Sequence, residues 1–258
     1  MAQMDRNEPV RLDKYLTEMG RGSRAFVKQW IKKGCVLVDG SRENRPERKI
    51  VPGETQVSLN GENVAFVSCE YVMLYKPAGC VSATEDGRER TVLEYLREDD
   101  CVRRKDLFPV GRLDKDTEGL LLLTNDGGLA HRLLSPRKHV WKKYYVQLRD
   151  DICDEDIECF ASGMDIGDGK MTLPARLQYA DLQDRRKVYV SLKEGRFHQI
   201  KRMFAARGNE VVYLKRLQMG TLKLDESLKP GEYRHLTAEE LELLNNEGNG
   251  IEDKTDEE

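Results

Sequence analysis

The sequence predicts an α+β protein with a small N-terminal module and a larger C-terminal domain. Residues 8–60 have the pattern of two helices followed by strands, whereas from residue 70 to 244 strand-like runs alternate with only a few helices. The run Leu120–Leu123 is too short to cross a membrane and suits a strand that is buried on both faces. We expect residues 61–69 to be a linker and residues 245–258, which are acidic and poor in apolar side chains, to be a disordered tail.

The N-terminal module begins with an amphipathic segment. Residues Arg11–Gly20 fit a helix with one apolar face. Ser23 is a suitable N-cap for a second helix, and Gly34 is a natural residue to follow its C-terminus. Strands over Cys35–Val38 and Thr55–Leu59 complete the module. The expected core face of the second helix is Phe26, Val27, Trp30 and Ile31.

The second helix also carries Arg24, Lys28 and Lys32, which we call the basic stripe. Residues four apart lie on the same side of a helix, so the three cations share a face. Three basic residues on a helix are ordinarily a solvated surface, but they also suit the phosphate backbone of a nucleic acid.

The larger domain contains further helix starts and strand-like runs. The predicted helices, each opening on an N-cap candidate, extend from Thr91 to Arg97, from Asp126 to Leu134 and from Asp154 to Ser162. The predicted strands are Tyr71–Tyr75, Tyr144–Leu148, Ala175–Tyr179, Val188–Leu192 and Val211–Leu217. Residues Gln199–Arg207 have helical periodicity.

The net charge of −3 hides an uneven distribution. Residues 239–258 carry nine acidic side chains and one lysine, and the remainder holds 42 basic and 37 acidic residues, an excess of five positive charges. An acidic global balance therefore does not exclude an RNA partner.

Cysteine and histidine usage gives no sign of a metal site. The chain has six cysteines without a Cys-x-x-Cys pair, and four histidines. Residues Met1–Pro9 are polar and no apolar run approaches membrane length. We expect reduced thiols, no metal, no membrane association and a cytoplasmic location.

Two acidic residues lie in a loop directly before the leucine run. Gly111-Arg112-Leu113-Asp114 is followed by Lys115-Asp116-Thr117-Glu118-Gly119. A loop anchored to a buried strand can hold a catalytic carboxylate rigidly. A turn in which aspartates only bond the backbone is an equally good interpretation of these residues alone.

Four blocks of the chain together resemble one enzyme family. They are Lys76-Pro77-Ala78-Gly79, Gly111–Gly127, Lys142–Val146 and Glu194–Phe204, which follow one another along the chain in the expected order. The pattern over residues 70 to 243 resembles the RsuA-type branch of the RNA pseudouridine synthases, and the N-terminal module resembles an S4 RNA-binding domain. The resemblance implies a long mixed, mostly antiparallel sheet flanked by helices.

The resemblance also implies a reaction. A pseudouridine synthase breaks the C1′–N1 bond of a uridine and rejoins the base through C5, an isomerisation that needs no cofactor. Asp114 matches the catalytic carboxylate, as nucleophile or as base, and Lys201 matches the cation that keeps it ionised. Tyr144 matches the aromatic that contacts the flipped base, and Asp116 is expected to hold the loop.

The remaining site assignments follow the same motifs. Ile200 is expected to pack on the other side of the uracil, and Arg112 to fill the space left by the flipped nucleotide. Arg196 and Arg202 are expected to contact phosphates, and the resemblance favours RNA binding by the basic stripe. Lys142 and Lys143 are further candidates for phosphate contact.

The fourth block favours one substrate class. Its His198-Gln199 pair resembles the branch that acts on small-subunit (16S) ribosomal RNA, within a partly assembled subunit or as free RNA. The alternatives are a large-subunit (23S) rRNA synthase of the same fold and a non-catalytic S4-type ribosome assembly factor. We expect a monomer.

Overall fold

The computed structural model describes residues 7–66, 69–96, 107–135, 138 and 140–247. These residues form two compact units, one up to Glu70 and one from Tyr71 onward. Among the described helices, none combines the length and the apolar character that crossing a membrane requires.

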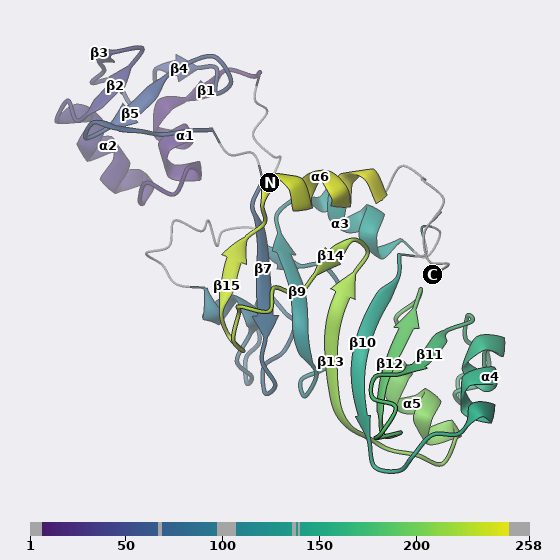
Figure 1. Ribbon diagram of the computed structural model, residues 1–258. Helices are drawn as coiled ribbons and strands as arrows, with labels where there is room; N and C mark the ends of the chain where they lie inside the picture. The colour runs from purple at the N-terminus through teal and green to yellow at the C-terminus, as the bar shows by residue number, and fades with distance from the viewer. Residues whose placement is uncertain (1–6, 67–68, 97–106, 136–137, 139, 248–258) are drawn as a thin grey trace. The chain divides into compact units, whose positions relative to one another are not determined.

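The N-terminal unit packs two helices on a small antiparallel sheet (Figure 1). Its elements are β1 (Val10–Arg11), α1 (Leu12–Glu18), α2 (Arg24–Lys32), β2 (Val36–Val38), β3 (Ser41–Arg42), β4 (Lys49–Ile50), β5 (Val57–Leu59) and β6 (Glu62–Asn63). The sheet order is β3-β2-β5-β6, and β1 pairs separately with β4. The Ser23 side chain accepts a hydrogen bond from the Phe26 amide, as its predicted N-cap role requires.

The predicted core face of α2 is wrong at one position. Val27 and Ile31, four residues apart, are buried against α1 and the sheet. Phe26 is 46% exposed, and its ring lies against that of the half-buried Trp30. The apolar stripe of α2 is wider than its contact with the rest of the unit, so its outer edge stays in solvent.

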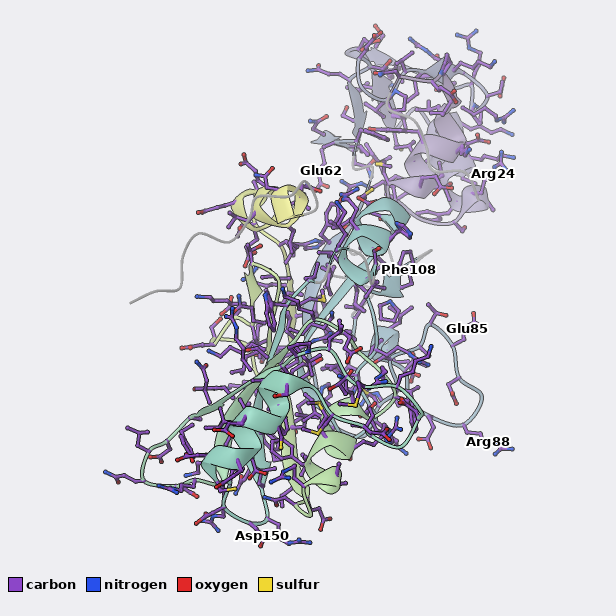
Figure 2. The ribbon with its side chains drawn as sticks, turned by 90° about the vertical axis from the view of Figure 1, so that its right-hand side faces the viewer. Arg24, Glu62, Glu85, Arg88, Phe108 and Asp150 are labelled. Carbon is purple, nitrogen blue, oxygen red and sulfur yellow. The ribbon has the colours of Figure 1, made fainter. Side chains whose placement is uncertain are left out.

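Two members of the basic stripe share a buried partner. The carboxylate of Asp13 on α1 accepts two hydrogen bonds of 3.0 Å from Arg11, and Arg24 and Lys28 lie 3.5 and 3.8 Å from it. The hydrogen bonds from Arg11 lower the pKa of Asp13, against the opposing effect of burial. Asp13 therefore orients both cations along α2, and Arg24 extends from the surface of this helix (Figure 2).

The C-terminal unit is a long mixed sheet with helices packed on it (Figure 1). Its elements are β7 (Tyr71–Lys76), a 3-10 helix η1 (Val92–Tyr95), β8 (Phe108–Pro109), β9 (Glu118–Thr124), α3 (Gly127–Leu134), β10 (Lys142–Leu148), α4 (Asp154–Ser162), β11 (Arg176–Tyr179), β12 (Lys187–Leu192), α5 (Gln199–Ala206), β13 (Val211–Met219), β14 (Leu222–Lys223), β15 (Tyr233–His235) and α6 (Ala238–Glu247). The order is β11-β12-β10-β13-β9-β7-β15, and the β9–β13 pair is parallel whereas the other pairs along this order are antiparallel. The predicted α+β class with a mixed, mostly antiparallel sheet is confirmed.

Two apolar cores support this sheet. One packs α4 and α5 on the strands β10, β11 and β12 through side chains such as Phe160, Phe204 and Val190. The other packs α3 and α6 over β7 and β9, where Leu120 and Leu122 are fully buried. The leucine run is thus the buried strand that the sequence predicts.

Several predicted boundaries shift. Thr91 caps a 3-10 helix that ends at Tyr95, and the predicted end at Arg97 lies outside the described residues. Cys153, rather than Asp154, is the N-cap of α4, because the Asp156 side chain bonds its amide.

The C-terminal boundary also moves. The strands β14 and β15 and the helix α6 have no counterpart among the predicted elements. Because α6 continues to Glu247, residues 245–247 are helical rather than part of a tail, and residues 248–258 lie outside the described part of the chain.

Gly119 brings β9 and β13 together. Its φ is +106°, and a Cβ atom on it would lie 2.2 Å from the carbonyl oxygen of Arg216. Only glycine allows this close parallel pairing. The Arg216 side chain crosses back to β9 and donates a hydrogen bond of 2.7 Å to the Leu120 carbonyl.

Candidate active site

The loop that carries Asp114 is fixed by backbone contacts from a neighbouring segment. The Ser82 hydroxyl bonds both the amide and the carbonyl of Leu113, at 3.0 and 2.9 Å. The Gly79 amide donates to the Lys115 carbonyl at 2.7 Å, and the Thr117 amide donates to that of Asp114. A loop held at these points keeps its carboxylate in place without help from solvent.

Lys76, at the end of β7, is fully buried beneath this loop. Its amine donates to the carbonyls of Pro77, Asp114 and Thr117 at 2.9–3.1 Å, with the carbonyl of Lys115 at 3.4 Å. Burial lowers the pKa of Lys76, while nearby carboxylates, including those of Asp116 and Asp114, oppose that shift. Because one amine binds several carbonyls of the loop, it fixes the loop backbone around Asp114.

Asp114 projects into an open pocket, where its side chain is 29% exposed. One carboxylate oxygen lies 3.7 Å from Nε2 of His198, and the other lies 3.8 Å from Nζ of Lys201. Both partners come from the start of α5, where His198 adopts a left-handed backbone conformation with φ of +51°. The His198 ring stacks on Phe197, which is 71% exposed.

Lys201 contacts a different carboxylate more closely than the one predicted. Its amine lies 2.6 and 2.7 Å from the two oxygens of Asp116. Burial opposes ionisation of Asp116, but the hydrogen bond and the charge of Lys201 outweigh it and lower the pKa of this carboxyl. Asp116 therefore joins the loop to α5 and shares Lys201 with Asp114. This contact is consistent with the prediction that Asp116 holds the loop, and Lys76 and Ser82 hold it at further points.

Several apolar side chains line the same pocket as Asp114. Tyr144 from β10 and Ile200 from α5 are 8% and 5% exposed and belong to one core. The other apolar lining residues are Leu113, Leu192 and Leu214. A flat heterocycle next to a carboxylate fits such walls, because an aromatic ring and an aliphatic side chain both offer faces for stacking.

Arg196 supplies hydrogen-bond donors to the same pocket. Its Nη1 is held at 3.0 Å by both Asp168 and the Lys170 carbonyl. Its Nε and Nη2 are buried and have no hydrogen-bond acceptor among the described residues. The buried Gln199 fixes this corner by accepting from the Arg196 amide and donating to Glu194. Arg112 also lines the pocket, and its side chain is exposed.

Comparisons with known proteins agree with this geometry. The RNA pseudouridylate synthase family model matches residues 70–206, and the S4 domain model matches residues 10–55. This chain belongs to the RNA pseudouridine synthase family.

Its relatives cover nearly the whole chain. An uncharacterized RNA pseudouridine synthase of Bacillus subtilis is 49% identical over 92% of this chain and 98% of the relative. Ribosomal small subunit pseudouridine synthase A of Vibrio parahaemolyticus is 40% identical over 91% of this chain and 99% of the relative. A crystal structure of a pseudouridylate synthase, 37% identical, superposes with a TM-score of 0.64 and covers 91% of this chain and 99% of that one. The synthase is of the RsuA type.

Two predicted contacts of the synthase do not lie in the pocket. Arg202 bonds the Ile166 carbonyl and lies near Asp168, so it fastens the segment before β11 instead of lining the site. The Lys142 amine is buried and donates to the Val140 carbonyl, which excludes it as a phosphate contact.

The motifs leave His198 open between a polar residue beside the site and an ordinary helix-start residue. Its imidazole lies next to the Asp114 carboxylate. No periodicity marks it, because a left-handed residue at a helix start follows no pattern. The apolar wall residues are visible as the inward positions of alternating strands.

Lys142 provides a stability test in the synthase. Burial, together with the charge of Arg216, lowers the pKa of Lys142 from 10.5 to about 8. A buried ammonium costs stability below about pH 8, and this cost is relieved as the pH rises toward 10.5, where the unfolded chain also loses its proton. Lys142→Met is therefore expected to stabilise the protein at pH 7 by up to about 3 kcal/mol. Urea unfolding at pH 7 and pH 10 measures this; a Met variant that is less stable at pH 7, or a difference that grows with pH, would contradict it.

Proposed function

We propose that this pseudouridine synthase isomerises a specific uridine of 16S ribosomal RNA. The observation that carries the proposal is the pocket that combines Asp114, the faces of Tyr144 and Ile200, and the donors of Arg196. Relatives of about 40% identity that are named ribosomal small subunit pseudouridine synthase A support the choice of the small subunit.

The reaction begins with extrusion of the target nucleotide. Taking a base out of its stack costs a few kcal/mol, and stacking on Tyr144 returns about 1–3 kcal/mol. Ile200 packs on the opposite side, and Arg112, at the exposed edge of the pocket, occupies the space left in the RNA. Arg196, whose Nε and Nη2 have no hydrogen-bond acceptor among the described residues, would bond the carbonyls of the uracil or an adjacent phosphate.

The Asp114 carboxylate then acts at the ribose, either as a nucleophile at C1′ or as a base on a ribose proton. In both cases the C1′–N1 bond breaks and its electron pair leaves with the uracil. The base turns, C5 bonds to C1′, and the C5 proton is lost while N1 gains one, so the product is an isomer of the substrate. The Lys201 amine, 3.8 Å from Asp114, places a positive charge beside this carboxylate in either role.

Mapping pseudouridines in rRNA, in cells with and without the gene, tests the substrate. We expect one 16S position to lose its modification and to regain it when the gene is restored. Loss of a 23S position instead would identify the large-subunit alternative, and no loss in either RNA would favour the assembly factor. Comparing free 16S transcript with partly assembled small subunits as substrates in vitro defines which is used. We expect the enzyme to act in the cytoplasm as a monomer. Size-exclusion chromatography with light scattering, with and without RNA, measures its mass and so tests the monomer.

The N-terminal unit contributes affinity in this proposal, because its basic stripe belongs to a separate compact unit from the pocket. Replacing Arg24, Lys28 and Lys32 by alanine is expected to weaken 16S rRNA binding and to lower its salt dependence by up to about three phosphate contacts. The rate at saturating enzyme is expected to fall far less than the affinity. Filter binding across a salt series measures the change.

A matched control removes the same charge from the same unit. Lys14, Arg42 and Lys49 are exposed and lie outside the stripe. Their triple alanine variant is expected to keep most of the affinity. An unchanged salt slope in the stripe variant would mean that the stripe is only a solvated surface.

A further inference from the structure

The face of the sheet opposite the pocket carries an unusual set of side chains. Tyr145 pairs with Tyr189 on β12 and with Lys215 on β13, and Lys215 pairs with Glu118 on β9. Side chains that are directly opposite on neighbouring strands point to the same side of a sheet. Successive side chains of a strand point to opposite sides of the sheet. Because Tyr144 lines the pocket, Tyr145 points to the side of the sheet that is opposite the pocket.

We call this surface the aromatic–basic face and define it by Trp141, Lys143, Tyr145, Tyr189, Tyr213 and Lys215. All six are partly exposed rather than buried. The helices α4 and α5 pack on the opposite side of the same strands, in the core that contains Tyr144 and Val190. Four neighbouring aromatic rings, those of Trp141, Tyr145, Tyr189 and Tyr213, are thus left partly exposed, and the buried ring of Tyr75 on β7 lies beside them.

Cations lie over most of these rings. The Lys143 amine is 4.4 Å from the ring centroid of Tyr189, and the Lys215 amine is 4.6 Å from that of Tyr75. Trp141 is contacted by both Arg176 and Lys193, at 4.7 and 4.6 Å. The rings of Tyr189 and Tyr213 each meet Tyr145 edge-on at 6.2 Å, which makes a continuous row.

The charge of this face is strongly positive. Lys143, Arg176, Lys193 and Lys215 form no ion pair with a carboxylate of the described residues. The carboxylate at its centre, Glu118, accepts hydrogen bonds from the hydroxyls of Tyr213 and Tyr75. At the edge, Lys187 is paired with Asp184 and Asp181.

We propose that the aromatic–basic face is a second RNA-binding surface of the enzyme, which holds a segment of the substrate RNA distant from the target uridine. Rows of aromatic rings beside unpaired cations are how proteins bind single-stranded RNA: bases stack on the rings and the amines meet the phosphates. The negatively charged phosphates of RNA complement the four cations of this face that form no ion pair. This inference rests on the proposed function, because it takes the substrate to be a long folded RNA that reaches both sides of the sheet.

Photo-crosslinking tests the surface directly. The full-length Asp114→Asn protein is bound to a 16S transcript that contains 4-thiouridine, irradiated and digested with trypsin. We expect crosslinks in the fragments 188–193 and 208–215, whose tyrosines, Tyr189 and Tyr213, belong to the face. Crosslinks confined to other fragments would overturn the proposal.

Binding measurements supply the quantitative arm. The double variant Lys143→Gln/Lys215→Gln is expected to lower the slope of log affinity against log salt by about 1.4, as two contacts to single-stranded RNA predict. Tyr189→Leu is expected to raise Kd about five-fold or more. The control Lys49→Gln/Lys229→Gln removes two exposed lysines outside the face and is expected to match the wild type.

The outcomes separate the two proposals. A double variant with the wild-type Kd and salt slope would show that the cations only cover the rings, and would overturn this inference even if a 16S position is modified. Crosslinks at Tyr189 would support an RNA-binding face. If, in addition, cells with and without the gene have the same pseudouridines in 16S rRNA, the proposed substrate is overturned and the RNA-binding face is not. Thermal melting of Tyr189→Leu checks its folding, and the glutamine pair keeps the test valid if that variant is unstable.

Discussion

Asp114→Asn is expected to reduce pseudouridine formation by at least about a thousand-fold while leaving RNA affinity within a few-fold of the wild type. Asparagine keeps the shape of the side chain but neither attacks a ribose carbon nor accepts a proton at neutral pH. Affinity comes mainly from phosphate contacts elsewhere on the protein. Release of tritium from 16S transcript labelled at uridine C5, with filter binding in parallel, measures both quantities.

Asp116→Asn is the informative comparison for this experiment. Asp116 is two residues away and bonds the same lysine, at 2.6 Å instead of 3.8 Å. We expect this variant to retain measurable turnover, because its carboxylate orients Lys201 without reaching the substrate. Turnover lost in Asp116→Asn but kept in Asp114→Asn would reverse the two roles.

Tyr144 is expected to give the second largest effect. Tyr144→Leu removes the ring face against which the uracil stacks and should slow single-turnover conversion by about ten- to a hundred-fold, the equivalent of about 1–3 kcal/mol. Tyr144→Phe keeps the ring, so its first bond-breaking step should remain fast. If the hydroxyl moves the proton near C5, the Phe variant should instead stop after the glycosidic bond has been cleaved.

The control is a tyrosine of the same sheet that lies outside the pocket. Tyr179, at the end of β11, is half-buried beside the same apolar core. Its leucine variant is expected to keep the wild-type rate. Full activity in both Tyr144 variants would show that Tyr144 serves packing alone.

Much of the fold is predictable because local signals and tertiary packing agree. The N-caps Ser23 and Asp126 are chosen by hydrogen bonds within three residues of each helix, so the sequence alone identifies them. The leucine run of β9 can only be buried on both faces. The strands β14 and β15 and the helix α6 are not predictable in this way; β15, for example, is a short polar segment that exists by pairing with β7.

In the site, too, local motifs predict some features and the tertiary fold decides others. The motifs locate Asp114, Tyr144 and Ile200, and the structure brings all three to one pocket. The partners of the charged side chains are not encoded locally. Lys201 meets Asp116, and Arg202 bonds the Ile166 carbonyl, because distances across the fold decide which carboxylate or carbonyl is nearest. The roles of these residues in turnover stay predictions.

The parallel pairing of β9 and β13 gives the molecule an order of assembly. It joins Glu118 and Gly119 to Lys215 and Arg216, segments far apart in the chain, and such non-local contacts form slowly. The apolar core of the N-terminal unit is formed by residues 10–66, which are close in the chain. A chain emerging from the ribosome would thus fold its S4 domain while its pocket still lacks β13, the strand that completes it. The nascent chain would then be able to bind RNA before its active site is complete.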